Sequence, residues 1–245
     1  MTDNIRLYED PETVNKYTSY STRVRQLNNA EKALIDRFKI HNKKIIVAGS
    51  GGGRVPANLV LFGNEVTGIE LSENLNQKAN ENFPKENFKN LTLLHGDVTD
   101  LSKFSNQEYD LAFFPQNGID LISDIKNREK AILELSIKVK PGGILAFSSH
   151  NNIAFAFSYK NFHTKRNIKG AFSPYYYAKE NVLGGGILFK GQPKYIINRT
   201  EELTGFKFIG FTCDIRNRFD GLVSRSLFLS SIIFGYILYV FENRQ

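Results

Sequence analysis

The sequence predicts an α/β fold: a seven-stranded, mostly parallel sheet with an antiparallel edge strand and helices on both faces. Two observations predict it. Between residues 41 and 150, short apolar runs rich in β-branched residues alternate with helical patterns of roughly 10–15 residues, as βαβ crossovers require. Near the carboxyl end, two further apolar runs follow each other without a full crossover helix, which predicts the antiparallel edge.

The first 40 residues read as helices that form a cover ahead of this core. Pro11 suits an N-terminal helical turn, and apolar residues then recur at helical spacing as far as Phe38. The periodic positions are Val24, Leu27, Ala30, Leu34, Ile35 and Phe38.

The predicted core begins at residue 41 and its elements alternate as far as residue 150. Pro141-Gly142-Gly143 is a helix stop signal in front of its last strand. The expected elements are strand Ile45–Ala48, helix Arg54–Phe62, strand Val66–Glu70, helix Glu73–Phe83, strands Leu91–His95 and Tyr109–Phe114, helix Lys126–Val139 and strand Ile144–Ser149.

The alternation stops after His150. Residues 151–198 are rich in aromatics, Lys, Asn and Gly, and we interpret them as an insertion on the substrate side. Thr200–Thr204 then reads as the end of a helix, followed by strands Lys207–Ile215 and Tyr236–Glu242. The chain is therefore expected to form one domain from four segments: a helical cover (1–40), the core (41–150), the insertion (151–198), and the last helix with the closing strands (199–245).

Composition favours a cytoplasmic globular protein. The 245 residues, 41 % hydrophobic and 23 % charged, can bury one sizeable core. The single cysteine, Cys213, excludes an internal disulfide framework. The first residues do not show a basic stretch followed by an apolar core, so we expect no secretory signal. The apolar run Leu227–Phe241 is interrupted by polar residues and short for a membrane span, so we expect a buried strand with its lead-in and no membrane association.

The net charge of +7 is unevenly distributed. Residues 1–150 hold 19 Lys and Arg against 19 Asp and Glu, whereas residues 151–245 hold 13 against 6. The whole excess therefore lies in the last 95 residues. A nucleic acid, a small anionic substrate or a merely solvated surface would each account for it.

A glycine-rich turn follows the first core strand, with the spacing G-x-G-x-G at Gly49, Gly51 and Gly53. Such a turn lets the backbone approach a ligand closely and aims helix N–H groups at it. The dinucleotide fingerprint G-x-G-x-x-G would need glycine or alanine where Arg54 stands, which argues against a nicotinamide-dependent oxidoreductase.

Two acids stand at the ends of the next two strands. Glu70 lies 17 positions after Gly53, where a carboxylate can accept both hydroxyls of a ribose. Asp97 follows the third strand, where it can accept from an adenine amino group while the N–H of Val98 donates to the ring. An oxidoreductase would give Asp97 no role.

Five sequence blocks in this order resemble the class I S-adenosylmethionine (SAM)-dependent methyltransferases, which have a Rossmann-like sheet. The resemblance covers roughly residues 40–150 and the two closing strands. The blocks are IIVAGSGGGR, VTGIELSEN, HGDVTDL, YDLAFFPQNGID and IKVKPGGILAFSSHN. One position departs from the family pattern, because Val47 stands where an acid usually precedes the first glycine by two residues.

The resemblance implies SAM as the cofactor, with S-adenosylhomocysteine as its product and no metal. Tyr20, in the helical cover, is assigned to the same site as an aromatic contact for the sulfonium. The cofactor residues expected in this way are Ala48, Gly49, Ser50, Gly51, Gly53, Glu70, Leu71, Asp97, Val98, Pro115, Gln116 and Tyr20.

The methyl acceptor is expected at the loops that follow the fourth and fifth strands. His150 is the candidate general base, and Asn117 the candidate group that orients the acceptor; a turn role would also explain either residue. The candidate substrate contacts are Tyr17, Asn151, Lys165, Arg166 and Tyr176. Lys165 and Arg166 belong to the basic stretch KNFHTKRNIK, which would hold phosphate or carboxylate if it faces the pocket.

These observations predict a methyltransferase that modifies a nitrogen or oxygen atom of a small, anionic metabolite, phosphorylated or nucleotide-linked. An RNA or nucleotide methyltransferase is an alternative, although no RNA-binding module is visible in the sequence. A non-catalytic protein that uses the same fold for binding is another, supported by Val47 alone. The oligomeric state is left open.

Overall fold

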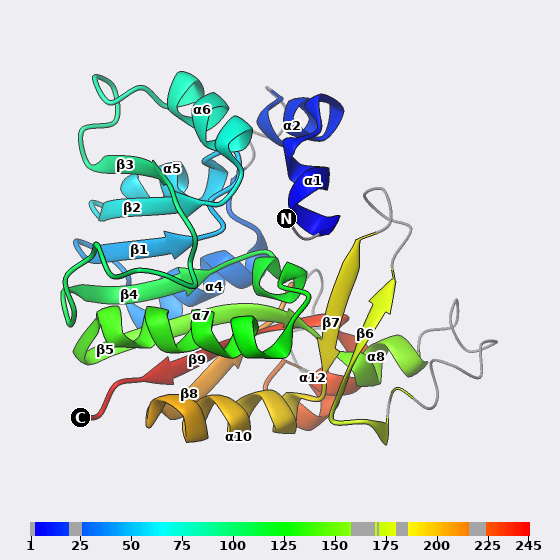
Figure 1. The fold of residues 1–245 in the computed structure, drawn as a ribbon. Coiled ribbons are helices and arrows are strands. Elements are labelled where there is room, and N and C mark those ends of the chain that lie inside the picture. The colour runs from blue at the N-terminus through cyan, green and yellow to red at the C-terminus, as the bar shows by residue number, and fades with distance from the viewer. Residues whose placement is uncertain (1–2, 20–25, 158–169, 171, 180–185, 216–223) are drawn as a thin grey trace.

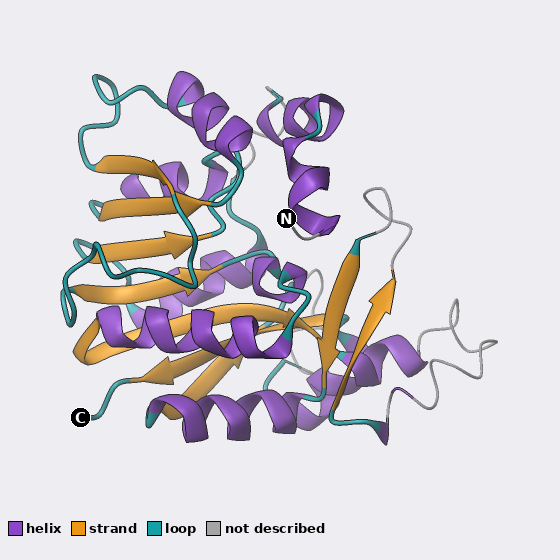
Figure 2. Ribbon diagram, viewed as in Figure 1, coloured by secondary structure: helices purple, strands orange, loops and turns teal. Residues whose placement is uncertain are grey.

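The computed structural model describes residues 3–19, 26–157, 170, 172–179, 186–215 and 224–245. Its centre is a seven-stranded sheet in the order β3-β2-β1-β4-β5-β9-β8 (Figures 1 and 2). The strands are β1 (Lys44–Ala48), β2 (Glu65–Glu70), β3 (Leu91–His95), β4 (Tyr109–Phe114), β5 (Val139–His150), β8 (Lys207–Thr212) and β9 (Tyr236–Glu242). The first five are parallel, while β9 runs antiparallel to both β5 and β8. The predicted mostly parallel sheet with an antiparallel edge is confirmed.

Alternation along β1 shows how the sheet buries both of its faces. Ile45 and Val47 enter one core cluster with α4 (Asn29–Phe38) and α5 (Arg54–Val60). Ile46 and Ala48 enter the other. Successive side chains of a strand point to opposite faces, so a strand covered on both sides reads as a continuous apolar run.

Helices cover the two faces in the same division. On the first face α6 (Glu73–Asn82) joins α4 and α5, and on the second α7 (Ile125–Lys138) lies beside α10 (Pro193–Thr204) (Figure 1). Capping fixes where they begin: Asn28 and Glu31 form a capping box at α4, and Ser72 and Asp124 cap α6 and α7.

The N-terminal cover consists of α1 (Asp3–Glu9) and α2 (Pro11–Thr18), which pack against α6 rather than against the sheet (Figure 1). The Ser72 hydroxyl donates to the carbonyl of Tyr8 at 2.9 Å, and Glu9 accepts from the N–H of Glu73 at 2.9 Å. The cover is therefore held at the start of α6, beside the carboxyl edge of the sheet.

Residues 151–198 hold more regular structure than their composition indicates. They contain α8 (Asn152–Phe157), the hairpin strands β6 (Tyr175–Lys179) and β7 (Ile187–Gly191), and the start of α10. The helix that was expected to end at Thr204 thus begins at Pro193, earlier than the boundary at residue 199 expected from sequence. Proline at the first helical position has the φ angle that a helix needs, but it is also a turn residue, so the sequence alone does not distinguish the two roles.

Other element boundaries differ as well, and β8 ends at Thr212 rather than at the expected Ile215. Strand β5 begins at Val139 rather than at the expected Ile144, and it runs through Pro141 and Gly142. These two residues are exposed, and the pairing of β5 with β4 shifts register in this region. The missing N–H of the proline therefore removes no hydrogen bond from the sheet. In the apolar run Leu227–Phe241, the predicted strand Tyr236–Glu242 is confirmed as β9, and the lead-in to it is helical. The run begins as helix α12 (Leu227–Ile233), capped by the hydroxyl of Ser226, and then enters β9. Within the described residues, no helix is both long and apolar enough to span a membrane.

Candidate functional site

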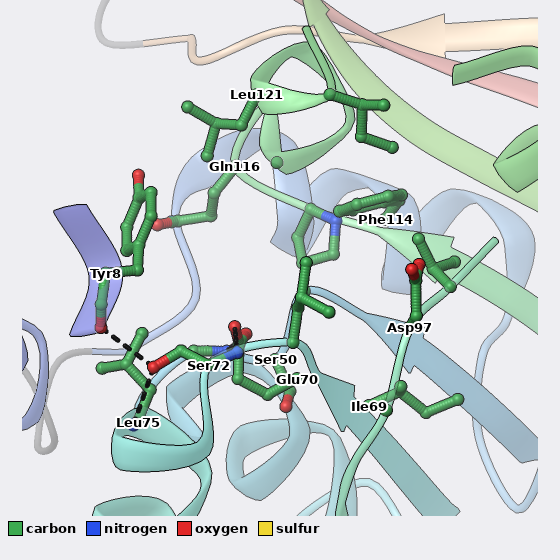
Figure 3. A pocket seen from close by; sticks show the side chains of 18 of the residues that line it. Tyr8, Ser50, Ile69, Glu70, Ser72, Leu75, Asp97, Phe114, Gln116 and Leu121 are labelled. Carbon is green, nitrogen blue, oxygen red and sulfur yellow. Dashed lines mark hydrogen bonds between the residues drawn. The ribbon is translucent and has the colours of Figure 1, made fainter. Parts of the chain in front are cut away.

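A pocket of about 320 Å³ lies at the carboxyl edge of the parallel strands, where their loops meet (Figure 3). This is the size of a site for one small ligand. Its walls come from the N-terminal cover, the loops after β1 to β4, and the start of α7. The lining residues are Tyr8, Tyr17, Gly49, Ser50, Gly51, Gly52, Arg54, Val55, Ile69, Glu70, Leu71, Ser72, Leu75, Gly96, Asp97, Val98, Thr99, Phe114, Pro115, Gln116, Gly118, Leu121, Ile122, Ser123, Asp124 and Asn127.

The turn after β1 brings backbone, rather than side chains, to the pocket. Gly49 and Gly51 have φ of +61° and +54°, the left-handed region that favours glycine. A Cβ at Gly49 would stand 2.7 Å from the Phe114 ring, whereas one at Gly51 would meet no atom within 4 Å. Next to them, the Ser50 hydroxyl is buried without a hydrogen-bond partner among the described residues. The turn thus offers a close backbone approach and one unused polar group.

Glu70 joins this turn to the next loop. One carboxylate oxygen accepts from the N–H of Gly51 at 2.7 Å, and the other accepts from the N–H of Ser72 at 3.0 Å. Burial raises the pKa of the Glu70 carboxyl, and these two N–H groups oppose the shift by stabilising the anion. A carboxylate oxygen has two lone pairs, so the group keeps acceptor capacity toward the pocket.

Asp97 lies across the pocket from Tyr8 and Gln116, with Glu70 and Phe114 between them (Figure 3). One oxygen of Asp97 accepts from the N–H of Thr99 at 2.8 Å, which fixes the carboxylate in its turn. The pocket therefore has two acidic acceptors spaced along its length, as the positions of Glu70 and Asp97 at successive strand ends predict.

Tyrosines of the N-terminal cover close the pocket at its other end. The rings of Tyr8 and Tyr17 pack with centroids 5.6 Å apart, and both residues line the pocket. Burial raises the pKa of the Tyr8 phenol, and the neighbouring Tyr17 raises this pKa further. The Tyr8 phenol therefore stays protonated near neutral pH. Tyr17 was predicted as a substrate contact, whereas Tyr8 was not among the predicted site residues.

The loop after β4 is held in an unusual backbone conformation. Gln116 and Asn117 both have φ of +57°, a region that side chains other than glycine rarely adopt. The N–H of Asn117 donates to the Ser148 hydroxyl at 2.7 Å, which ties the loop to β5. Strain of this kind persists where surrounding contacts enforce it and is concentrated at functional sites. Pro115 and Gln116 line the pocket, and Asn117 lies just behind it.

A buried polar network lies behind that loop and includes His150. Asp120 accepts from the His150 backbone N–H at 2.6 Å, contacts the imidazole Nδ1 at 2.8 Å and accepts from the Ser149 hydroxyl at 2.7 Å. The Arg128 guanidinium is 3.5 Å from Asp120 and stacks 3.9 Å from the Phe189 ring centroid. Asp120 and Arg128 are fully or almost fully buried, whereas the His150 side chain is 20 % exposed.

The two predicted catalytic residues face each other at this network. The Asn117 amide nitrogen is 3.5 Å from His150 Nε2, and the Asn117 amide oxygen is buried without a partner in the described part of the chain. Neither residue belongs to the pocket lining. The sequence predicted both residues as candidates but did not predict Asp120.

The other predicted residues separate into three groups. Gly49, Ser50, Gly51, Glu70, Leu71, Asp97, Val98, Pro115, Gln116 and Tyr17 line the pocket together. Ala48, Gly53, Asn151 and Tyr176 lie outside its lining. Tyr20, Lys165 and Arg166 fall outside the described residues.

The residues outside the lining have packing or turn positions. Gly53 begins α5 with φ of +84°, and a Cβ there would meet the Phe83 ring at 2.8 Å. The buried Asn151 amide donates to two backbone carbonyls, of Ser231 at 2.6 Å and Phe234 at 3.0 Å, joining β5 to the α12–β9 turn. Tyr176 lies on β6.

Sequence reasoning missed several lining residues, among them Arg54, Tyr8 and Asp124. Arg54 was considered only as the position that breaks the dinucleotide fingerprint. Asp124 caps α7 through the N–H of Asn127 at 2.9 Å, so its sequence signal is that of an ordinary helix cap. No local pattern indicated that either side chain reaches the pocket.

Comparison with known proteins gives one match to a family and several to individual proteins. Residues 46–147 match the family described as a methyltransferase domain. The ubiquinone biosynthesis O-methyltransferase of Coxiella burnetii is 27 % identical over 128 residues, a segment that is 52 % of either chain. The match thus spans about half the length of this curated relative.

Solved structures match over most of the chain. The CcbJ methyltransferase from Streptomyces caelestis has a TM-score of 0.68 and 15 % identity, with both chains fully covered. The Burkholderia thailandensis 1,6-didemethyltoxoflavin-N1-methyltransferase, solved with 1,6-didemethyltoxoflavin and S-adenosylhomocysteine, has a TM-score of 0.64 and 10 % identity over 98 % of this chain and 88 % of its own. At such identities the likeness shows a shared fold.

The buried network predicts a large stability effect at Asp120. Replacing Asp120→Ala leaves the Arg128 charge buried and uncompensated, so we expect the free energy of unfolding to fall by about 3–5 kcal/mol in urea denaturation. Asp124→Ala is the matched control, because it removes an acid from the same segment and loses only a helix cap, about 1 kcal/mol. Equal losses in the two variants would show that the network does not stabilise the fold.

Proposed function

Because the chain belongs to the class I SAM-dependent methyltransferases, we propose that it transfers the methyl group of SAM to a nitrogen or oxygen atom of a small, anionic metabolite. The acceptor we propose is phosphorylated or nucleotide-linked. The observation that carries the proposal is the pocket itself, which combines the glycine turn, two carboxylates and the cover tyrosines at the carboxyl edge of the sheet.

The residues of the pocket fit SAM. Glu70 has acceptor capacity for the ribose hydroxyls, and Asp97 with the Val98 N–H suits the edge of an adenine. The open space at Gly51 and the unpartnered Ser50 hydroxyl leave room and a polar contact for the rest of the cofactor. When bound, SAM supplies an electrophilic methyl group on a positively charged sulfur, and aromatic rings such as those of Tyr8 and Tyr17 favour a cation beside them.

The protein's own contribution to methyl transfer is alignment and proton removal. The strained Gln116-Asn117 backbone sets the wall where the acceptor would approach, and water exclusion depends on the cover. His150 is proposed as the base that takes the acceptor's proton at Nε2. Asp120 contacts Nδ1 and would stabilise the imidazolium that results. Asn117, next to Nε2, is proposed to orient the acceptor.

The proposed anionic acceptor rests on charge distribution. Arg54 is the one cation among the described lining residues, beside the carboxylates Glu70, Asp97 and Asp124. The cations must therefore come from the insertion side, where residues 151–245 carry the entire +7. Lys165 and Arg166 are proposed to hold the anion by charge-assisted hydrogen bonds. The curated ubiquinone O-methyltransferase relative supports a small-molecule acceptor.

The cofactor assignment predicts that Gly51→Ala abolishes tight S-adenosylhomocysteine binding. The added methyl would occupy pocket space, and we expect at least a tenfold loss of affinity by isothermal titration calorimetry. Gly142→Ala is the matched control: its φ of +74° is also positive and its Cβ also meets no atom within 4 Å, but it lies outside the pocket. Both variants should lose about 1–2 kcal/mol of stability to left-handed strain. Equal S-adenosylhomocysteine affinity in the two variants would show that the glycine turn does not contact the cofactor.

The proposed base predicts a selective loss of turnover. With the best acceptor found in a panel of phenols, amines and phosphorylated metabolites, His150→Ala should lower kcat by about 10²–10⁴ and leave S-adenosylhomocysteine affinity unchanged. His41→Ala, an exposed histidine before β1, is the control and should change neither value. A full rate in His150→Ala would show that the acceptor needs no base at this position.

The proposed anion site predicts a KM effect at the insertion. Neutralising Lys165 and Arg166 together should raise the acceptor KM about tenfold, with kcat and cofactor affinity unchanged, as expected for lost uniform binding. Replacing the exposed Lys89 and Lys103 with alanine is the charge-matched control, because these residues lie in the segments that lead into the amino ends of β3 and β4, away from the pocket lining. If the acceptor is uncharged and its KM does not change when Lys165 and Arg166 are neutralised, the proposal of an anionic substrate is refuted.

A further inference from the structure

A buried ion pair forms part of the pocket wall near the N-terminal end of α5. The Arg54 guanidinium contacts both carboxylate oxygens of Glu31, at 3.0 and 3.2 Å, and donates to the carbonyl of Gln26 at 3.0 Å. Arg54 is 7 % exposed and lines the pocket, whereas Glu31 is 2 % exposed and lies behind it. Burying two charges is costly, so a pair in this position calls for a functional explanation.

Glu31 is fixed before any ligand arrives. It is the third residue of α4 and closes the capping box by accepting from the N–H of Asn28 at 2.8 Å. The same carboxylate accepts from the Gln116 side-chain amide at 3.3 Å. Glu31 thus connects three elements: the start of α4, the start of α5 and the strained loop after β4.

Arg54 and Gln116 both line the pocket, and each keeps one polar group outside these contacts. A guanidinium has five N–H donors, and the contacts to Glu31 and Gln26 leave the Arg54 Nε–H without a partner among the described residues. Because the Gln116 amide nitrogen donates to Glu31, its carbonyl oxygen is the free end and can only accept. The wall therefore presents a cationic donor beside a neutral acceptor that is backed by a carboxylate.

We propose that Arg54 and Gln116, positioned by Glu31, bind the zwitterionic amino-acid end of SAM. In this arrangement Arg54 donates to the α-carboxylate, and the Gln116 oxygen and the Glu31 charge hold the α-ammonium. The inference rests on the proposed cofactor. The amino-acid end of SAM carries a positive and a negative charge on one carbon, and the wall carries the positive charge of Arg54 and the negative charge of Glu31. Each buried charge of the ligand or the wall therefore has an opposite charge nearby.

The position of Val47 supports this assignment. The resemblance places an acid there to help hold the methionine end, but the Val47 side chain is fully buried in the core cluster that it shares with α4. The chain therefore lacks that carboxylate on β1. Glu31 supplies a carboxylate from α4, the helix packed on the same face of the sheet.

The direction of the bound cofactor agrees with the location of the wall. If adenosine extends between Asp97 and Glu70, its 5′ substituent continues toward Gln116, on the far side of Phe114 from Asp97 (Figure 3). Arg54 and Gln116 both line this pocket.

The test compares two ligands that differ only in the amino-acid end. S-adenosylhomocysteine carries it, and 5′-methylthioadenosine lacks it while keeping the adenine, ribose and sulfur. By isothermal titration calorimetry, Gln116→Leu and the double variant Glu31→Gln/Arg54→Met should each weaken S-adenosylhomocysteine binding at least tenfold. The affinity for 5′-methylthioadenosine should change less than about twofold. The double variant removes both buried charges together, so it avoids an orphaned ion.

Asp97→Asn is the matched control, because it touches the part that both ligands share and should weaken them equally. Gln116→Leu leaves the ion pair intact, so it reports on the wall even if the double variant unfolds. Equal losses for both ligands in Gln116→Leu, or unchanged S-adenosylhomocysteine affinity, would overturn the amino-acid site. Wild-type protein that binds neither ligand would instead refute the cofactor assignment.

Discussion

The carboxylate of Glu70 connects the loops that form the floor of the pocket. Its two oxygens accept from the N–H groups of Gly51 and Ser72, so one side chain at the end of β2 fixes both the glycine turn and the start of α6. The Ser72 hydroxyl then donates to the Tyr8 carbonyl, which attaches the N-terminal cover at the same point. Because a buried carboxylate needs these partners, the shape of the floor and the position of the cover depend on one another.

Two further buried acids each hold a pair of side chains, one pair in the pocket wall and the other outside the lining. Glu31 holds Arg54 and Gln116 on the side of α4, and Asp120 holds His150 and Arg128 on the side of β5. Neither acid lines the pocket itself. In both networks the buried carboxylate accepts from several groups at once, and these contacts restrict the orientation of its partners. Such preorganisation is what alignment-dependent chemistry requires.

The pocket and the insertion have different charges, which suits two ligands of different kinds. The described lining carries three carboxylates and Arg54, an environment suited to a cofactor with a positive sulfur. The positive excess lies in residues 151–245, on the chain that follows β5. One of these cations, Lys190 on strand β7, is buried. The proposed anionic acceptor would be attracted by this positive excess rather than by the carboxylates of the pocket.

Sequence alone predicted the parts of this protein that depend on local pattern. The strands Leu91–His95 and Tyr109–Phe114 were predicted to the residue, because a short apolar run bounded by polar residues is a local signal. The acids Glu70 and Asp97 were placed at one pocket for a topological reason. Parallel strands joined by right-handed crossovers end at the same edge, so residues at successive strand ends must converge.

Only the tertiary structure determined which distant side chains meet there. Glu31 lies 23 positions before Arg54 and 85 before Gln116, and nothing in the spacing of α4 shows that its capping residue also faces a loop after β4. The same holds for Asp120, which lies 30 positions before His150 and which the structure places against it. Asn151 is the opposite case, because it was predicted as a substrate contact and lies outside the pocket lining. Its side-chain amide donates to backbone carbonyls of the α12–β9 turn. Helix packing, rather than chain periodicity, decides these contacts, because the orientation of each helix on the sheet is set by the whole core.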